Sequence, residues 1–129
     1  MTPEERLKKA TLLIVEDEPE AAEAMATIVR SLVGRVIRAA NGAEGLKMVH
    51  RENPDMILSD MEMPVMTGME MVRHLRAEGR RLPILAVTIY HDAYHRSEGV
   101  DKVIFKPIER DELRASLVEL AQKLSENIK

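Results

Sequence analysis

The 129-residue sequence predicts an α/β fold in which a doubly wound, five-stranded parallel sheet is covered by helices on both faces. The first observation is that short apolar runs alternate five times with longer segments whose apolar residues recur at helical spacing. The second is that most of these runs are continuously apolar, as is typical of strands buried on both faces. The predicted strands span residues 11–15, 35–39, 56–60, 83–88 and 102–105.

Length and composition favour a single globular domain spanning residues 11–127, preceded by a charged lead-in, residues 1–10, that we expect to be loosely ordered. The net charge of −3 gives no electrostatic reason to bind nucleic acid or an anionic membrane. The sequence contains no cysteine, and no apolar stretch approaches the ~18 residues of a transmembrane helix. The chain also lacks the apolar core of a signal peptide, so we expect a cytoplasmic protein.

Helical signals follow each of the first three strands. Pro19 suits a first helical turn, and Gly34 is expected to end that helix. Asn41 is expected to cap a second helix that continues to Arg51. A third helix is predicted over residues 68–78, with its apolar residues on one face.

The last part of the chain carries a weaker and a stronger helical signal. Residues 89–99 are ambiguous, and we expect a short helix over about 92–98 that ends at Gly99. The final helix is predicted over residues 109–127, with one apolar stripe consisting of Leu113, Leu117, Leu120 and Leu124. A solvated basic face is expected from Arg73, Arg76, Arg80 and Arg81.

Polar groups follow four of the predicted strands, at the point where each strand ends. These groups are the acidic pair Glu16 and Asp17, the single carboxylate of Asp60, the hydroxyl of Thr88 and the amine of Lys106. The carboxyl ends of parallel strands meet at one edge of a sheet, where open α/β folds place their sites. If the four strands are neighbours, these groups form one site.

These residues carry a resemblance to a known family. The matching segments are Ile14-Val15-Glu16-Asp17-Glu18-Pro19, Ser59-Asp60-Met61-Glu62-Met63-Pro64-Val65-Met66-Thr67-Gly68, Val87-Thr88 and Lys106-Pro107. In this order and spacing the chain resembles the receiver domain of bacterial two-component response regulators, from about residue 11 to residue 124. The resemblance implies a three-layer, flavodoxin-like fold with strand order 2-1-3-4-5.

The carboxylates at this edge predict a divalent metal site. At ~4 Å each like-charged pair costs about 4 kcal/mol at an effective dielectric constant near 20, and a divalent cation removes that repulsion. Oxygen ligands without histidine or cysteine suit Mg²⁺ or Mn²⁺. The expected direct ligands are Asp17, Asp60 and the backbone carbonyl of Glu62. Glu16 stands where the family more often has Asp, and we expect it to bind through water.

The resemblance also implies the chemistry. Asp60 would attack the phosphohistidine of a sensor histidine kinase or a histidine phosphotransfer protein and become an aspartyl phosphate. Lys106 would supply positive charge to the phosphoryl oxygens, and Thr88 would hydrogen-bond one of them. The Lys106–Pro107 peptide is expected to be cis, which would aim the lysine inward. Such a receiver catalyses only its own phosphorylation and dephosphorylation.

Three departures from the family pattern predict altered switching. Lys106 follows Thr88 by 18 residues, about four fewer than usual, so the fourth crossover helix of the fold is expected to be shortened by roughly one turn. Val103 occupies the position of the usual switch aromatic. Ile89 follows Thr88 where a small residue is usual, and it should restrict access to Asp60.

Other functions agree less well with the sequence. A phosphohydrolase of the haloacid-dehalogenase type also uses an Asp nucleophile with Mg²⁺, but it needs a second Asp where this chain has Glu62. A nucleotide-binding module would need a glycine-rich phosphate loop, and no such motif occurs. The chain could also be a receiver cut from a longer regulator or hybrid kinase.

Overall fold

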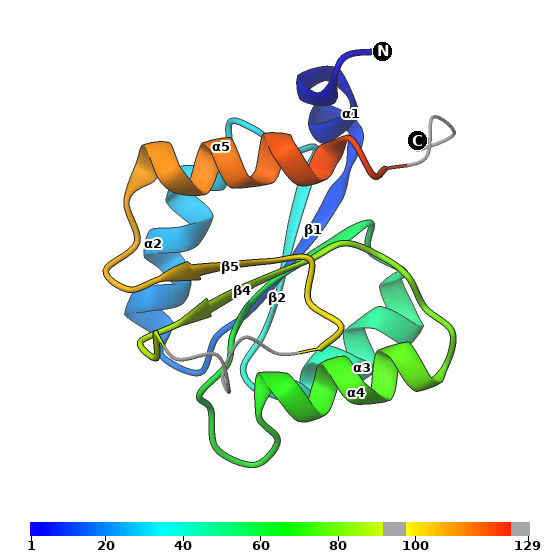
Figure 1. The fold of residues 1–129 in the computed structure, drawn as a ribbon, viewed down its shortest axis with the longest axis vertical. Helices are drawn as coiled ribbons and strands as arrows, with labels where there is room; N and C mark the ends of the chain where they lie inside the picture. The colour runs from blue at the N-terminus through cyan, green and yellow to red at the C-terminus, as the bar shows by residue number, and fades with distance from the viewer. Residues whose placement is uncertain (92–97, 125–129) are drawn as a thin grey trace.

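The computed structural model describes residues 1–91 and 98–124, and it shows the predicted parallel sheet. The strand order is β2-β1-β3-β4-β5, and all neighbours pair in parallel (Figure 1). The strands are β1 (Thr11–Val15), β2 (Arg35–Ala39), β3 (Met56–Asp60), β4 (Ile84–Thr88) and β5 (Lys102–Phe105). The predicted order is confirmed, and the strand bounds agree to within one residue.

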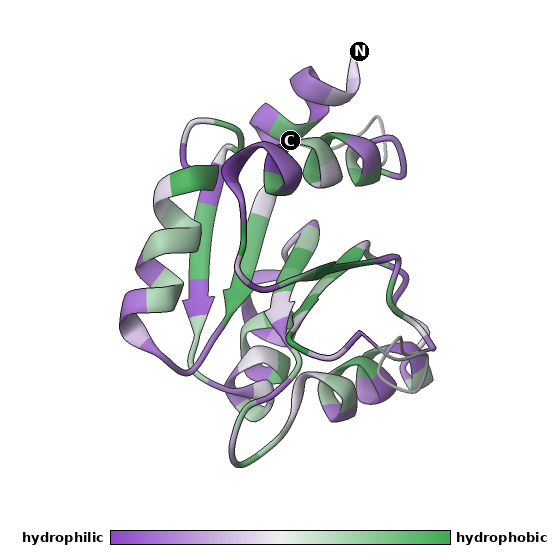
Figure 2. Ribbon diagram, turned by 60° about the vertical axis from the view of Figure 1, so that its left-hand side comes forward, coloured by the Kyte–Doolittle hydropathy of each residue, from purple (hydrophilic) through white to green (hydrophobic). Residues whose placement is uncertain are grey.

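The helices form one layer on each face of the sheet. They are α1 (Pro3–Lys9), α2 (Pro19–Val29), α3 (Gly42–Glu52), α4 (Gly68–Ala77) and α5 (Arg110–Ala121). One core cluster joins α1, α2 and α5 to alternate strand residues such as Leu12, and the other joins α3 and α4 to the intervening residues, such as Leu13. Successive strand residues therefore point into different layers, which explains why the runs are continuously apolar. Figure 2 shows hydrophobic strands between amphipathic helices.

The helix starts mostly follow the sequence signals, but the end of α2 does not. The Asn41 side chain accepts a hydrogen bond from the backbone N–H of Glu44 at 2.9 Å, as its predicted capping role requires. The prediction that α2 continues to Gly34 is wrong, because the helix ends at Val29. Gly34 instead lies against the α1–β1 junction, where an added Cβ would come within 2.7 Å of the Lys8 carbonyl oxygen. The glycine is needed for this close approach.

The expectation of a loosely ordered N-terminal lead-in is also wrong. Residues 3–9 form α1, which packs near the C-terminal end of α5 (Figure 1). Thr2 and Glu5 form a capping box, Leu7 is only 1% exposed, and Arg6 donates to the carbonyl oxygens of residues 122 and 124. A strong cap and one apolar anchor thus order a segment whose composition is mostly charged.

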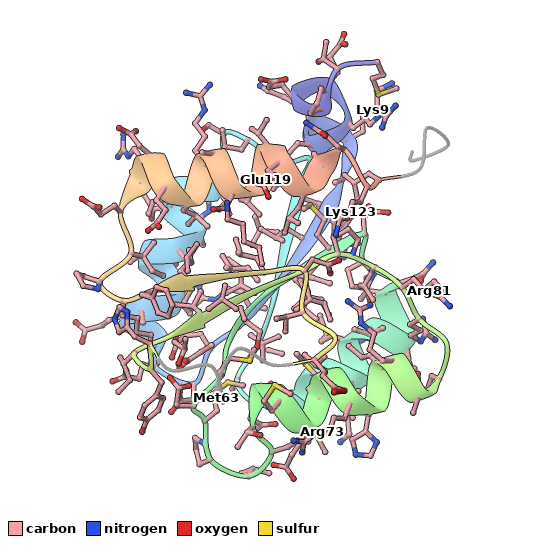
Figure 3. All side chains as sticks on the ribbon, viewed as in Figure 1. Lys9, Met63, Arg73, Arg81, Glu119 and Lys123 are labelled. Atoms are coloured by element: carbon pink, nitrogen blue, oxygen red, sulfur yellow. The ribbon has the colours of Figure 1, made fainter. Side chains whose placement is uncertain are left out.

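The connection between β4 and β5 is anchored by Arg76 of α4. Its guanidinium donates to the carbonyl oxygens of Gly99, Arg80 and Leu82, at 2.8–2.9 Å, and to the carboxylate of Asp101 at 3.0 Å. The predicted solvated basic face is therefore wrong for Arg76, whereas Arg73 and Arg81 do point away from the fold (Figure 3).

Two features at the C-terminal side bear on the remaining predictions. All four leucines of the predicted α5 stripe are buried, although the helix ends at Ala121 rather than continuing toward residue 127. The short helix predicted over 92–98, and with it the shortened crossover, falls largely on residues 92–97, which lie outside the described residues. Within the described part of the chain, no helix combines the length and the apolar character needed to cross a membrane.

We expect Leu7→Ala to lower the free energy of unfolding by about 2–4 kcal/mol, because it removes a fully buried side chain that joins α1 to the core. Urea denaturation measures the change. Lys9→Ala, on the exposed side of the same helix, is the control and should stay within about 0.5 kcal/mol of wild type. A loss below about 1 kcal/mol for Leu7→Ala would show that α1 contributes little to the fold.

Candidate functional site

The carboxyl ends of β1, β3, β4 and β5 lie side by side, as the sequence predicts. Val15 pairs with Ser59 across β1 and β3, so Glu16 and Asp60 follow at the same level. Thr88 pairs with Phe105 across β4 and β5, and Lys106 comes next. The predicted acidic, hydroxyl and amine groups therefore meet at one edge of the sheet.

Three carboxylates form the centre of this site. One oxygen from each of Glu16, Asp17 and Asp60 lies within 4.8 Å of the others. The side chains of Glu16 and Asp60 are 0% and 3% exposed. The ammonium of Lys106 lies 3.3 Å from Asp60 Oδ2 and 4.0 Å from Glu16 Oε1. Among the residues that the structure describes, this one ammonium group is paired with the carboxylates, which leaves an excess of negative charge at a buried edge.

The donor set fits a hard divalent cation. Glu16 Oε2 accepts a hydrogen bond from the Glu18 backbone N–H at 3.1 Å, but Glu16 Oε1 is buried and has no hydrogen-bond partner among the described residues. A buried carboxylate oxygen without a donor is unfavourable unless a cation or proton satisfies it. Because the cluster presents only oxygen atoms, it suits Mg²⁺ or Mn²⁺ better than Zn²⁺.

Burial and neighbouring charges change the proton affinities in the cluster. Burial raises the pKa of Glu16 to about 7, and the negative charge of Asp60 adds to the effect, while the Glu18 N–H and Lys106 oppose it. For Lys106, burial acts to lower the pKa, but the nearby carboxylates of Asp60 and Glu16 outweigh it and raise the pKa above its usual value. The lysine therefore remains charged at neutral pH.

The backbone around Asp60 holds its carboxylate in place. Asp60 Oδ1 accepts from the backbone N–H of Glu62 at 3.2 Å, while Oδ2 faces Lys106. The Ser59 hydroxyl donates to the Asp60 carbonyl oxygen at 2.8 Å. The following loop returns so closely that a Cβ at Gly68 would collide with that same carbonyl oxygen, so a glycine is required there.

The side chain of Glu62 makes contacts that the sequence did not predict. Its Oε2 accepts a hydrogen bond from the Thr88 hydroxyl at 2.7 Å, and its Oε1 accepts from the Ile89 backbone N–H at 3.4 Å. Thr88 Oγ1 in turn accepts from the Tyr90 N–H at 3.1 Å. The sequence prediction assigned only the backbone carbonyl of Glu62 a role, because no pattern indicates where a loop carboxylate points.

The residues singled out for switching and access lie within β5 and in the segments that follow β4 and β5. The peptide between Lys106 and Pro107 is cis, as predicted. Ile89 is 56% exposed, and Val103 is partly buried in the middle of β5, opposite Ala86.

A second feature missed from the sequence lies at the end of β5. The ring of Phe105 stacks on His91, with centroids 4.0 Å apart and an interplanar angle of 16°. The only phenylalanine of the chain thus stands next to Lys106 rather than three residues before it.

Curated relatives share the chain over most of its length. It is 36% identical over 118 residues to hybrid signal transduction histidine kinase D of Dictyostelium discoideum, covering 87% of this chain and 8% of the kinase. It is 31% identical over 110 residues to the transcriptional regulatory protein GlrR of Escherichia coli K12, covering 82% of this chain and 25% of the regulator. The chain therefore spans only a fraction of the length of these relatives.

Solved structures show the same fold. The receiver domain of sensor histidine kinase PA1611 from Pseudomonas aeruginosa, with a magnesium ion coordinated in its active-site cleft, is 31% identical with a TM-score of 0.80, and the match covers 88% of this chain and 98% of that one. The signal receiver domain of a histidine kinase from Syntrophus aciditrophicus is 29% identical with a TM-score of 0.82, over 93% and 97% of the two chains.

A family model agrees with these matches. The model for the response regulator receiver domain matches residues 12–118, which include the strand ends that build the acidic site. The chain belongs to the response regulator receiver domain family of two-component systems.

Proposed function

We propose that Asp60 accepts a phosphoryl group from the phosphohistidine of a sensor histidine kinase or a histidine phosphotransfer protein. The observation that carries the proposal is the placement of the Asp60 carboxylate, which is buried, 3.3 Å from the Lys106 ammonium and clustered with Glu16 and Asp17. Relatives that are histidine kinases or response regulators support a phosphohistidine donor.

In the proposed reaction one carboxylate oxygen of Asp60 forms a bond to phosphorus while the phosphorus–nitrogen bond of the donor breaks. The bonding electron pair returns to the imidazole nitrogen, which then takes up a proton. Lys106 neutralises part of the charge on the phosphoryl oxygens, and the Glu62 N–H keeps Asp60 oriented. Hydrolysis of the acyl phosphate would reset the site, so the chain acts on its own phosphoryl group.

The metal of this reaction would be held by Asp17, Asp60 and the Glu62 carbonyl, with Glu16 reaching it through water. Bound Mg²⁺ or Mn²⁺ would offset negative charge on the phosphoryl group during transfer. The unpartnered Glu16 Oε1 and the three clustered carboxylates support this assignment, as does the magnesium ion in the similar PA1611 receiver.

A phosphohydrolase of the haloacid-dehalogenase type is not favoured, because the matches are to receiver domains. Beryllium fluoride with Mg²⁺ separates the two functions experimentally. A receiver should bind the mimic at Asp60 and should not turn over phosphate esters, whereas sustained ester hydrolysis would support the phosphohydrolase.

Treatment with acetyl phosphate and Mg²⁺ should add one phosphate to wild type and none to Asp60→Asn. Asp60 is the carboxylate that faces Lys106 most closely while lying in the acidic cluster. Intact-mass spectrometry of both proteins measures the result. Glu109→Gln, which removes a carboxylate just before α5, is the matched control and should still be labelled. Equal labelling of Asp60→Asn would reject Asp60 as the acceptor.

Millimolar Mg²⁺ should raise the melting temperature of wild type by a few degrees, because binding to the native state at tenfold the dissociation constant stabilises it by about 1.4 kcal/mol. Asp17→Asn should remove most of this response. Differential scanning calorimetry in chelator and in Mg²⁺ makes the comparison. Identical melting of wild type under both conditions would argue against a metal site.

In chelator, wild type should lose stability relative to Glu16→Gln as the pH rises from about 4.5 to about 7. The Glu16 pKa is raised from 4.5 to about 7, so the native state binds the proton more tightly, and the stabilisation is present below pH 4.5 and lost as the pH rises through 7. The expected change is on the order of 3 kcal/mol.

Urea denaturation at pH 5 and pH 7.5 measures this difference between wild type and Glu16→Gln. Saturating Mg²⁺ should reduce the pH dependence, since the metal replaces the proton. A difference that is the same at both pH values would show that Glu16 does not titrate in this range.

A further inference from the structure

Glu62 connects the loop after β3 to the end of β4 through its carboxylate. The carboxylate accepts from the Thr88 hydroxyl at 2.7 Å and, at a longer 3.4 Å, from the Ile89 N–H. The backbone N–H of the same residue donates to Asp60 Oδ1. One residue therefore holds the acceptor aspartate with its backbone and the end of β4 with its side chain.

While the contact with Glu62 is in place, Thr88 cannot donate a hydrogen bond to a phosphoryl oxygen, which is the role expected of it. A threonine hydroxyl has one hydrogen to donate, and here it is donated to Glu62. The Thr88 oxygen also accepts from the Tyr90 N–H at 3.1 Å, so the hydroxyl is held from both sides. Thr88 cannot donate to an oxygen bound to Asp60 until the Glu62 contact breaks.

Charge favours the breaking of this contact on phosphorylation. A phosphoryl group on Asp60 carries up to two negative charges and would lie beside the Glu62 carboxylate, which is close enough to influence the pKa of Lys106. Like charges repel strongly at a half-buried site. The phosphoryl oxygens and the Glu62 carboxylate would therefore compete for the same donor.

We propose that Glu62 is a positioning residue whose carboxylate restrains Thr88 and residues 89–90 in the resting state, and that phosphorylation of Asp60 displaces it. This inference rests on the proposed function of Asp60. The consequence is that movement begins in residues 88–91. It would reach β5 through the His91–Phe105 stack. An ion pair from Lys102 to Glu119 of α5 (2.7 Å) and another from Lys123, just after α5, to Asp101 (2.8 Å) tie the C-terminal side of the chain to the region around β5; Figure 3 labels Glu119 and Lys123.

The first experiment uses metal-free, unphosphorylated protein and so does not depend on phosphoryl transfer. Amide hydrogen exchange of residues 89 and 90 should be at least about fivefold faster in Glu62→Ala than in wild type. The Ile89 N–H loses its acceptor, and the Thr88 hydroxyl that accepts from the Tyr90 N–H is no longer held by Glu62. Glu109→Ala, which removes a carboxylate that makes no capping bond, should exchange like wild type at these positions. Unchanged exchange in Glu62→Ala would overturn the proposal.

The second experiment measures how readily Thr88 becomes available. The beryllium fluoride concentration that half-saturates the protein in Mg²⁺ should fall about tenfold in Glu62→Ala, because the competing charged acceptor is gone. Glu62→Gln keeps an acceptor without the charge and should give a smaller fall, and Glu109→Ala should stay within about twofold of wild type. Binding by Glu62→Ala that is no tighter than in wild type would contradict the proposal.

The two experiments separate the failure of this inference from that of the proposed function. If wild type binds neither beryllium fluoride nor phosphate while Glu62→Ala still exchanges faster at 89 and 90, the restraint is supported and the acceptor role of Asp60 is rejected. If wild type is phosphorylated and Glu62→Ala behaves like it in both experiments, the acceptor role is supported and the restraint is rejected.

Discussion

The free-energy cost of burying carboxylates at the end of a hydrophobic sheet is the constraint on which the site depends. Glu16 and Asp60 are almost fully buried, and a buried charge is tolerated only when donors or cations surround it. Backbone N–H groups of Glu18 and Glu62 supply two donors, and Lys106 supplies a positive charge. The remaining excess of negative charge attracts cations, so the same imbalance that weakens the fold prepares the site for metal and phosphoryl chemistry.

The register of the sheet joins this chemistry to the core. Val15 opposite Ser59 and Thr88 opposite Phe105 bring the functional residues to one level, and the strand residues below them fill both apolar layers. A shift of one residue between neighbours would exchange the two layers and separate the carboxylates from the lysine. Correct packing of the core is therefore also what assembles the site.

Much of the fold and of the candidate site could be predicted because both depend on patterns within short stretches of the sequence. Continuous apolar runs marked the strands, and the polar residue after each run marked the edge where Asp60, Lys106 and the others meet. The structure differs where a single tertiary contact decides. Leu7 orders a charged N-terminal segment, and Gly34 serves a close approach rather than a helix end. The orientation of the Glu62 carboxylate depends on a partner 26 residues away, which no local pattern records.

The Arg76 guanidinium has a consequence for how the β4–β5 connection can vary. It donates hydrogen bonds to the carbonyl oxygen of Gly99 and to the carboxylate of Asp101, and that carboxylate also accepts a hydrogen bond from the Ile84 N–H at the start of β4. The residues just before β5 are thus hydrogen-bonded to α4 and to the start of β4, and these contacts do not involve the segment that follows Thr88. The shortened connection that the sequence predicts would therefore be compatible with an undisturbed acidic edge, because the contacts that fix the start of β5 do not depend on its length.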